Sequence, residues 1–252
     1  MAKSVKITKR EQKRIDALVN HYKSNQALVQ TMLDQLKLAI ENSAPLMRHV
    51  HSVRWRTKDS DHLRDKLFRN FLKTKEDGAK FEITRDNLFE RINDLAGFRI
   101  LHLHSEQIVE IDQQLQNLFR EFRYELVEKP QARTWDDEYR EFYKQAGIEP
   151  IDSPKMYTSV HYVIASNSET KVTCEIQVRT LAEELWGEVD HSMNYPYESE
   201  LLACREQIKV LARVTSSCSR LVDSIFRTSR EGSAHRMADA RLTRGRSLKK
   251  GF

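Results

Sequence analysis

The segment KVTCEIQVRT, residues 171–180, alternates between apolar and polar side chains, and a β-strand sorts such a pattern onto two opposite faces. The apolar face carries Val172, Cys174, Ile176 and Val178, and the polar face carries Glu175, Gln177 and Arg179. The pattern therefore predicts a strand with one face in a core. The other face, with an acid, an amide and a cation, either meets solvent or lines a functional site. This strand alone leaves both alternatives open.

A second alternating segment, YTSVHYVI at residues 157–164, is joined to this strand through the polar stretch SNSET, which predicts a hairpin. Its apolar face carries Val160, Tyr162 and Ile164, and its polar face carries Tyr157, Ser159 and His161. In an antiparallel pair, we expect this polar face beside Glu175 and Gln177. A lone histidine or tyrosine is more often a packing residue, but polar faces on two neighbouring strands favour a site.

Two further segments bring opposite charges together. RINDLAGFRILHLH, residues 91–104, reads as a buried strand with Asp94 just before it and Arg99 within it. HSVRWRTK, residues 51–58, alternates so that Arg54, Arg56 and Lys58 share one face. Two carboxylates beside several cations suit a magnesium–triphosphate site, because Mg²⁺ takes one or two carboxylates plus substrate phosphates. Arginine-rich strand faces also bind RNA phosphates, so the charges alone leave the ligand open.

Helical periodicity organises most of the remaining chain. It predicts one long helix over residues 8–42, helices over 61–73, near 86–92, over 105–119, 136–145 and 180–193, and a last helix over 198–228. Thr180 and Glu183 match a capping box. A short strand is expected near 122–128, followed by an irregular segment around the helix at 136–145. Helices, then a mixed sheet with crossovers, then helices predict an α+β fold.

Four regions are expected: an N-terminal helical region at 1–44, a central domain at 45–196, a C-terminal helix at 197–229 and a basic, disordered tail at 230–252. The net charge of +5 over 252 residues fits a protein that handles phosphates or merely a solvated basic surface. The cysteines lack metal-site spacing, and no glycine-rich phosphate loop is present, which argues against P-loop and Rossmann enzymes. Without a run of ~20 apolar residues, we expect a soluble, cytoplasmic protein with no membrane contact.

Four motifs together resemble the synthetase domain of the RelA/SpoT family of alarmone synthetases: HSVRWRTK, RINDLAGFRI, YTSVHYVI and CEIQVRTLAEELWGEVDHSMNY. The acid-x-x-Gly-x-Arg and Glu-x-Gln-x-Arg-Thr elements, in this order, are specific as a pair. The resemblance covers residues 45–196, with flanking helices similar to those of the small stand-alone members. It implies a nucleotidyltransferase-like fold, a mixed sheet flanked by helices. It also implies transfer of the β,γ-pyrophosphate of ATP to the 3′-hydroxyl of GDP or GTP, with release of AMP.

The resemblance implies a role for each residue on the donor side of the site. Asp94 and Glu175 would hold Mg²⁺, and Glu175 would also help to deprotonate the attacking hydroxyl. The positions that would bind ATP are Arg56, Lys58, Lys66 and Arg99. The first three would contact the phosphates, and Arg99 would lie against the adenine.

The acceptor side follows the family pattern less closely. Tyr157 would stack on the acceptor base, His161 would lie near its sugar and phosphates, and Gln177 and Arg179 would support the site. Guanine-nucleotide synthetases usually carry Lys-x-Asn-Gly-Tyr before the serine and histidine, whereas this chain reads DSPKMYTSVHY. Lys155 would therefore meet the acceptor, either at guanine O6 or at a phosphate.

This departure leaves several expectations open. The favoured acceptor is GDP or GTP, and the alternatives are the 3′-CCA end of tRNA, as in toxin-type relatives, and an adenine nucleotide. A non-catalytic nucleotide- or RNA-binding module is the alternative of another class. The terminal helices suit self-association into a homo-oligomer, although packing on the chain's own body explains the apolar stripe of the last helix equally well. No alarmone hydrolase activity is expected.

Overall fold

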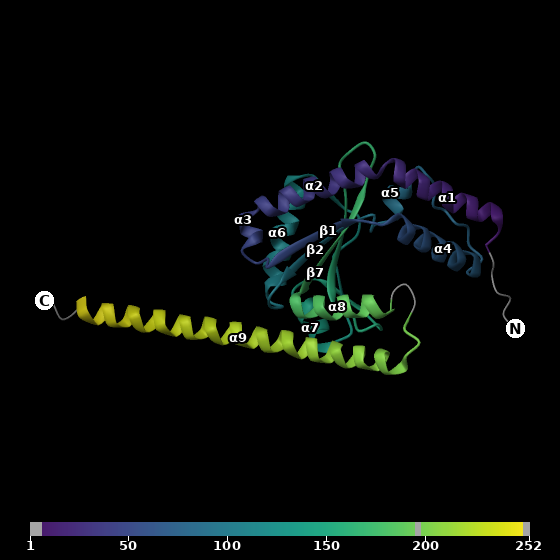
Figure 1. Cartoon of the computed structure of the whole chain (residues 1–252). Helices are drawn as coiled ribbons and strands as arrows, with labels where there is room; N and C mark the ends of the chain where they lie inside the picture. Colours follow the sequence, from purple (N-terminus) through teal and green to yellow (C-terminus); the bar gives the residue numbers. More distant parts are fainter. Residues whose placement is uncertain (1–6, 195–197, 249–252) are drawn as a thin grey trace.

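The computed structural model describes residues 7–194 and 198–248, and it describes the backbone alone for 234–248. A mixed sheet of seven strands forms the centre of the molecule. In Figure 1, α2 (Gln26–Asn42) lies above this sheet, and α8 (Leu181–Asn194) and α9 (Leu202–Leu248) lie below it. The expected α+β fold, a mixed sheet flanked by helices, is confirmed.

The sheet has the strand order β1-β2-β7-β6-β4-β5, and β3 pairs with β6 on the side. The strands are β1 (Ser52–Thr57), β2 (Ala96–His102), β3 (Glu125–Leu126), β4 (Gln131–Thr134), β5 (Glu149–Asp152), β6 (Ser159–Ala165) and β7 (Thr173–Thr180). The expected hairpin is confirmed, since β6 and β7 are antiparallel neighbours. β2 runs parallel to β7 and antiparallel to β1.

Two short strands were missed where an irregular segment was expected. β4 and β5 flank α7 (Asp137–Gln145), pair with each other in parallel and extend the sheet beyond β6. Each is only four residues long, too short to show a period of two in the sequence. They exist because β6 offers β4 an edge, a contact that no local pattern encodes.

The remaining helices are α1 (Lys9–Ser24), α3 (Ala44–Met47), α4 (Ser60–Glu76), α5 (Leu88–Arg91) and α6 (Gln107–Glu121). The single long helix expected over 8–42 is wrong, because the chain breaks at Asn25 between α1 and α2. Asn25 leaves the helical region, with φ −120° and ψ 16°, and its side chain donates to the His21 carbonyl oxygen at 2.8 Å. An asparagine side chain competes in this way with the backbone hydrogen bonds of a helix. The apolar residues therefore keep their helical spacing across Asn25, although the chain forms two helices.

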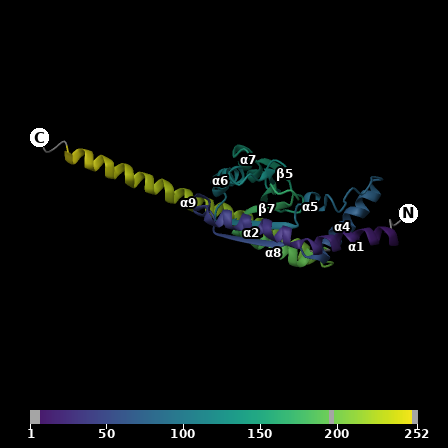
Figure 2. The ribbon, with the colours of Figure 1, turned by 90° about the horizontal axis from the view of Figure 1, so that it is seen from above.

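A disordered tail was expected from residue 230, but residues 230–248 are helical because α9 continues to Leu248. The segment contains no proline and several strong helix formers, and this outweighed its low apolar content. Residues 249–252 of that tail and 1–6 of the N-terminal region lie outside the described residues. Figures 1 and 2 show α9 running past the body of the molecule and extending well beyond it.

The apolar faces predicted for the two hairpin strands are buried as expected. Tyr162, Cys174 and Ile176 have no exposed surface and belong to one large core cluster with α1, α2, α4 and α6. The Tyr162 hydroxyl donates to Asp112 of α6 at 2.8 Å, which satisfies its polar end inside the core. In the described part of the chain, no helix is both long enough and apolar enough to cross a bilayer.

Candidate active site

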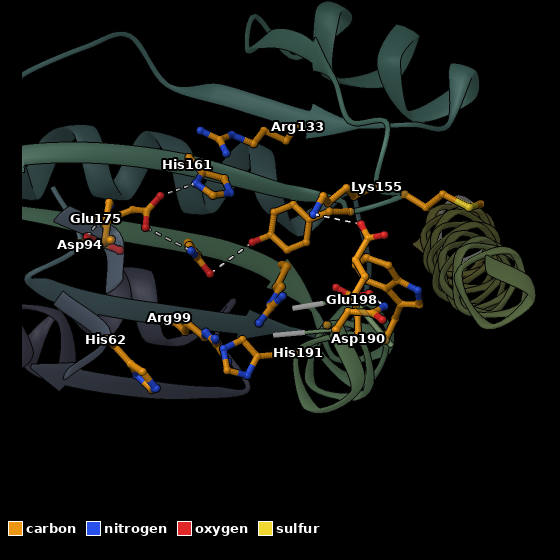
Figure 3. Close-up of a pocket in the computed structure, with 18 of the residues that line it drawn as sticks. His62, Asp94, Arg99, Arg133, Lys155, His161, Glu175, Asp190, His191 and Glu198 are labelled. Atoms are coloured by element: carbon orange, nitrogen blue, oxygen red, sulfur yellow. Dashed lines mark hydrogen bonds and ion pairs between the residues drawn. The ribbon is translucent and has the colours of Figure 1, made fainter. Parts of the chain in front are cut away.

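A cavity of about 1200 Å³ lies on the polar face of β7, and all of the predicted site residues line it. Its walls come from β1, β2 and β6, from α4 and α8, and from the first turns of α9. Predicted residues on its lining are Arg56, Lys58, Lys66, Asp94, Arg99, Lys155, Tyr157, His161, Glu175, Gln177 and Arg179. The polar strand face therefore lines a cavity and is not merely a solvated surface (Figure 3).

Asp94 is held between two lysines. Lys58 Nζ donates to Asp94 Oδ2 and Lys66 Nζ donates to Asp94 Oδ1, each at 2.7 Å. Burial raises the pKa of Asp94, but the charges and hydrogen bonds of both lysines outweigh it, so the net pKa is lowered. Asp94 is thus an ionised carboxylate at neutral pH.

Glu175 lies close by because Gly97 pairs with it between parallel strands, and Asp94 precedes Gly97 by three residues. His161 Nδ1 lies 2.8 Å from Glu175 Oε1, and Gln177 Nε2 donates to Glu175 Oε2 at 3.3 Å. Burial raises the pKa of Glu175, but the hydrogen bond and charge of His161, together with the charge of Lys66, leave the net pKa lowered. Figure 3 shows His161 pointing toward Glu175, with Asp94 beside it.

The residues predicted for the acceptor side extend this network. The Tyr157 hydroxyl donates to Gln177 Oε1 at 3.2 Å, and the Tyr157 ring meets His161 edge-on at 5.6 Å. Arg179 places its guanidinium over the Tyr157 ring at 5.6 Å from the centroid. The two polar strand faces expected to lie side by side are therefore linked by direct hydrogen bonds.

Lys155 lies on the rim of the cavity and is exposed. Its Nζ is 3.7 Å from Glu198 Oε1, and Arg205 of α9 approaches the other oxygen of Glu198 at 4.0 Å. Figure 3 shows Lys155 and Glu198 facing each other at the mouth. A phosphate entering there would meet two cations that are now paired with a carboxylate.

Glu184 of α8 is a site residue that the sequence motifs did not indicate. Its side chain is 7% exposed and forms ion pairs with Arg54, Arg99 and Arg179. Arg99 also pairs with Glu188, one helical turn further along. The sequence did contain a signal for these ion pairs. Glu184 and Glu188 are four residues apart on the helix that follows the Arg179 strand, and residues i and i+4 share one helix face.

The buried position of Arg179 depends on a close approach between β7 and α8. The side chain is 2% exposed, and any Cβ at Gly187 would collide with its guanidinium. Gly187 therefore leaves the space that lets Arg179 reach both Glu184 and the Tyr157 ring. Other lining residues not singled out from the sequence are His62, Arg69, Arg133, Trp186, Asp190, His191 and Lys209.

The donor set around Asp94 and Glu175 fits Mg²⁺. Both side chains are ionised oxygen donors in one cavity, and the charge of Asp94 acts to raise the pKa of Glu175. A carboxylate oxygen that accepts from a lysine keeps a second lone pair for a cation. Among the side chains that the structure describes, in residues 7–194 and 198–233, no group of three or more His, Cys, Asp or Glu is suited to a metal. Two carboxylates completed by substrate phosphates are the arrangement that Mg²⁺ accepts.

A sequence profile described as "Region found in RelA / SpoT proteins" matches residues 55–200, more than half of the chain. The chain belongs to the RelA/SpoT family. The resemblance expected from the four motifs is confirmed. The matched region of this RelA/SpoT protein overlaps most of the central domain expected at 45–196, and the boundaries of that domain stay a prediction.

Among curated proteins, the RelA/SpoT chain is similar to GTP pyrophosphokinase YjbM of Bacillus subtilis (strain 168), with 26% identity over 162 residues. This match covers 62% of the chain and 66% of the relative, so the chain spans about two thirds of that protein's length.

Solved structures with a similar fold include small alarmone synthetase 1 of Bacillus subtilis bound to its product pppGpp, with a TM-score of 0.58 and 20% identity. That match covers 81% of this RelA/SpoT chain and 96% of the other. The same synthetase bound to AMPCPP has a TM-score of 0.57 and 19% identity, covering 84% and 99%. At this identity the likeness establishes the fold, and the fold agrees with the one that the motifs implied.

Proposed function

We propose that the protein is an ATP-dependent pyrophosphokinase that transfers the β,γ-pyrophosphate of ATP to the 3′-hydroxyl of GDP or GTP and releases AMP. The observation that carries the proposal is a pair of ionised carboxylates in one cavity, Asp94 between two lysines and Glu175 beside His161. Membership of the RelA/SpoT family supports it. So does its similarity to a GTP pyrophosphokinase and to a small alarmone synthetase solved with pppGpp or AMPCPP.

The donor nucleotide is assigned to the end of the cavity formed by β1, β2 and α4. Arg56, Lys58 and Lys66 line this end and neutralise the phosphates of ATP. The guanidinium of Arg99 is already fixed by Glu184 and Glu188, so it offers a flat, oriented surface to the adenine ring.

The acceptor is assigned to the end formed by β6, β7 and the rim lysine. Tyr157 stacks on its base, and Lys155 meets a phosphate or the base edge. His161 contacts both Tyr157 and Glu175, and this arrangement supports an acceptor sugar next to the carboxylate.

In the reaction, the 3′-oxygen attacks the β-phosphorus of ATP, and the bond from that phosphorus to the α,β-bridging oxygen breaks. AMP leaves with the electron pair of that bond, and the hydroxyl proton passes to Glu175. Glu175 is suited to this step because His161 and Gln177 orient its two oxygens and its lowered pKa keeps it unprotonated. Positioning and charge neutralisation supply most of the catalysis in phosphoryl transfer.

We assign Asp94 and Glu175 as the protein ligands of Mg²⁺. When bound there, the ion neutralises charge on the transferred pyrophosphoryl group. The two lysines beside Asp94 keep that carboxylate ionised and oriented into the cavity, whether or not the ion is bound.

A second candidate acceptor is the 3′ end of tRNA. The observation in its favour is that Lys155 and Met156 stand where guanine-specific relatives carry an asparagine and a glycine. A stacking tyrosine by itself accepts any base, since every base has a π face.

We also propose that the enzyme works in the cytoplasm, where both nucleotides are available.

The deciding experiment incubates the purified chain with labelled ATP and Mg²⁺ in parallel reactions. Each reaction contains one candidate acceptor: GDP, GTP, excess ATP or deacylated tRNA. AMP release and a pyrophosphorylated product are measured by chromatography, with an EDTA-treated reaction as control. Product with GDP or GTP is expected. Product with tRNA or ATP alone would replace the acceptor assignment, and nucleotide binding without product from any acceptor would make the chain a binding module.

A further inference from the structure

The acceptor end of the cavity has an apolar wall that joins it to α9. Trp186 of α8 is 3% exposed and packs with Ile208 and Ala212 of α9. Met156 and Tyr157 are partly buried against the same residues. We call Met156, Trp186, Ile208 and Ala212 the α9 cluster.

Trp186 is fixed from the α9 side by a buried hydrogen bond. Its Nε1 donates to the Ile208 carbonyl oxygen at 3.0 Å. The Trp186 and Tyr157 ring centroids are 6.2 Å apart at a tilt of 46°, within the range of favourable aromatic pairs. Tyr157 thus contacts Trp186 as well as the guanidinium of Arg179, which is itself tied to Glu184.

Met156 supplies a second restraint on the same tyrosine. Its φ of +61° lies in the left-handed region, which is unfavourable for a residue with a Cβ. Such a conformation persists only where surrounding contacts impose it. Packing of the Met156 side chain on the other members of the α9 cluster supplies those contacts, and the next residue along the chain is Tyr157.

We propose that Trp186 and Met156 are positioning residues through which α9 holds Tyr157 in the orientation that receives the acceptor base. The inference rests on the proposed function, because it concerns the acceptor of that reaction. The ATP end of the cavity shares no member of the α9 cluster. Loosening the cluster therefore weakens acceptor binding and leaves donor binding intact.

The test compares Trp186→Ala, Trp186→Phe and Met156→Ala with the unchanged chain. KM is measured for the acceptor and for ATP, and AMPCPP binding is measured by calorimetry. We expect Trp186→Ala to raise the acceptor KM about 2- to 10-fold, the range of one lost aromatic contact, with AMPCPP affinity unchanged. Leu185→Ala is the matched control, because Leu185 is on the same helix and 56% exposed.

The outcomes separate this inference from the proposed function. If the unchanged chain gives no product with any acceptor, the proposed function fails. If it is active but the variants change ATP and acceptor KM equally, or change neither, the positioning role is overturned. If circular dichroism shows that Trp186→Ala is unfolded, the same KM comparison is made with Trp186→Phe and Met156→Ala.

Discussion

Lys58 and Asp94 form an ion pair of 2.7 Å across the start of β2, and Lys66 of α4 closes on the other oxygen of the same carboxylate at 2.7 Å. Lys58 directly follows β1, Lys66 is on α4 and Asp94 is in the turn before β2, so the fold brings Asp94 to lysines 36 and 28 residues away in the sequence. This arrangement keeps Asp94 ionised inside a cavity and aims two cations at the same place.

Lys58→Met is expected to reduce kcat/KM for ATP about 10- to 100-fold, because it removes one charge-assisted hydrogen bond of Asp94 and one cation facing the phosphates. Steady-state kinetics with varied ATP measure this. Lys171→Met is the matched control, since Lys171 pairs with Glu125 on the surface away from the cavity. Equal activity of both variants would remove Lys58 from the site.

Asp94→Asn and Glu175→Gln are each expected to lower turnover on the order of 100-fold or more, because each exchanges a magnesium-ligand carboxylate for a neutral amide of the same shape. Thermal melts are expected to stay close to those of the unchanged chain. Mg²⁺ titration by calorimetry, with AMPCPP present, gives a readout independent of turnover. Undiminished Mg²⁺ affinity in both variants would refute the ligand assignment.

Tyr157→Ala is expected to raise the acceptor KM ~5- to 150-fold, since losing one base stack costs about 1–3 kcal/mol. Tyr157→Phe keeps the ring and loses the hydrogen bond to Gln177, so its effect is expected to be smaller. The measurement is KM for the acceptor at saturating ATP. An alanine variant indistinguishable from the phenylalanine variant would contradict stacking.

Glu183 makes stability depend on pH. Its side chain is buried at the start of α8, where the carboxylate accepts from the Thr180 amide at 2.9 Å, and burial raises its pKa from 4.5 to about 7. The folded chain therefore holds a proton there that the unfolded chain releases above pH 4.5. The resulting stability is complete below pH 4.5 and is lost as pH rises through 7.

Glu183→Gln keeps an acceptor for the Thr180 amide and removes the titration. Relative to the unchanged chain, its free energy of unfolding is expected to rise by about 3 kcal/mol on going from pH 4.5 to pH 8, at 1.36 kcal/mol per unit of pKa shift. Urea unfolding at both pH values checks this. A difference that is the same at pH 4.5 and pH 8 would show that Glu183 is not the titrating group.

The outer face of α9 carries exposed apolar side chains at coiled-coil spacing, and we propose that it pairs with α9 of a second copy. Val214, Leu221 and Ile225 are 58%, 63% and 58% exposed, and Cys218 continues the spacing of four and three. Light scattering is expected to show a dimer or larger assembly that Leu221→Glu dissociates. Val109→Glu on α6, also exposed, is the control. A strict monomer at micromolar concentration would contradict the pairing.

The sequence by itself determined the alternating strands, the charged cluster and the family. A period of two places Glu175 and Gln177 opposite the core whatever the rest of the chain does, and the hairpin register then brings His161 beside them. These rules are local, so the strand face of each such residue can be predicted without knowledge of the fold.

The tertiary structure decided what depends on distant contacts. The short strands β4 and β5 exist because β6 is available to pair with β4. Glu184 became the partner of three arginines, and Trp186 reached Tyr157 and Ile208, only because α8 and α9 pack below the sheet. The period of one segment shows which of its faces is buried, but it does not show which distant segment covers that face.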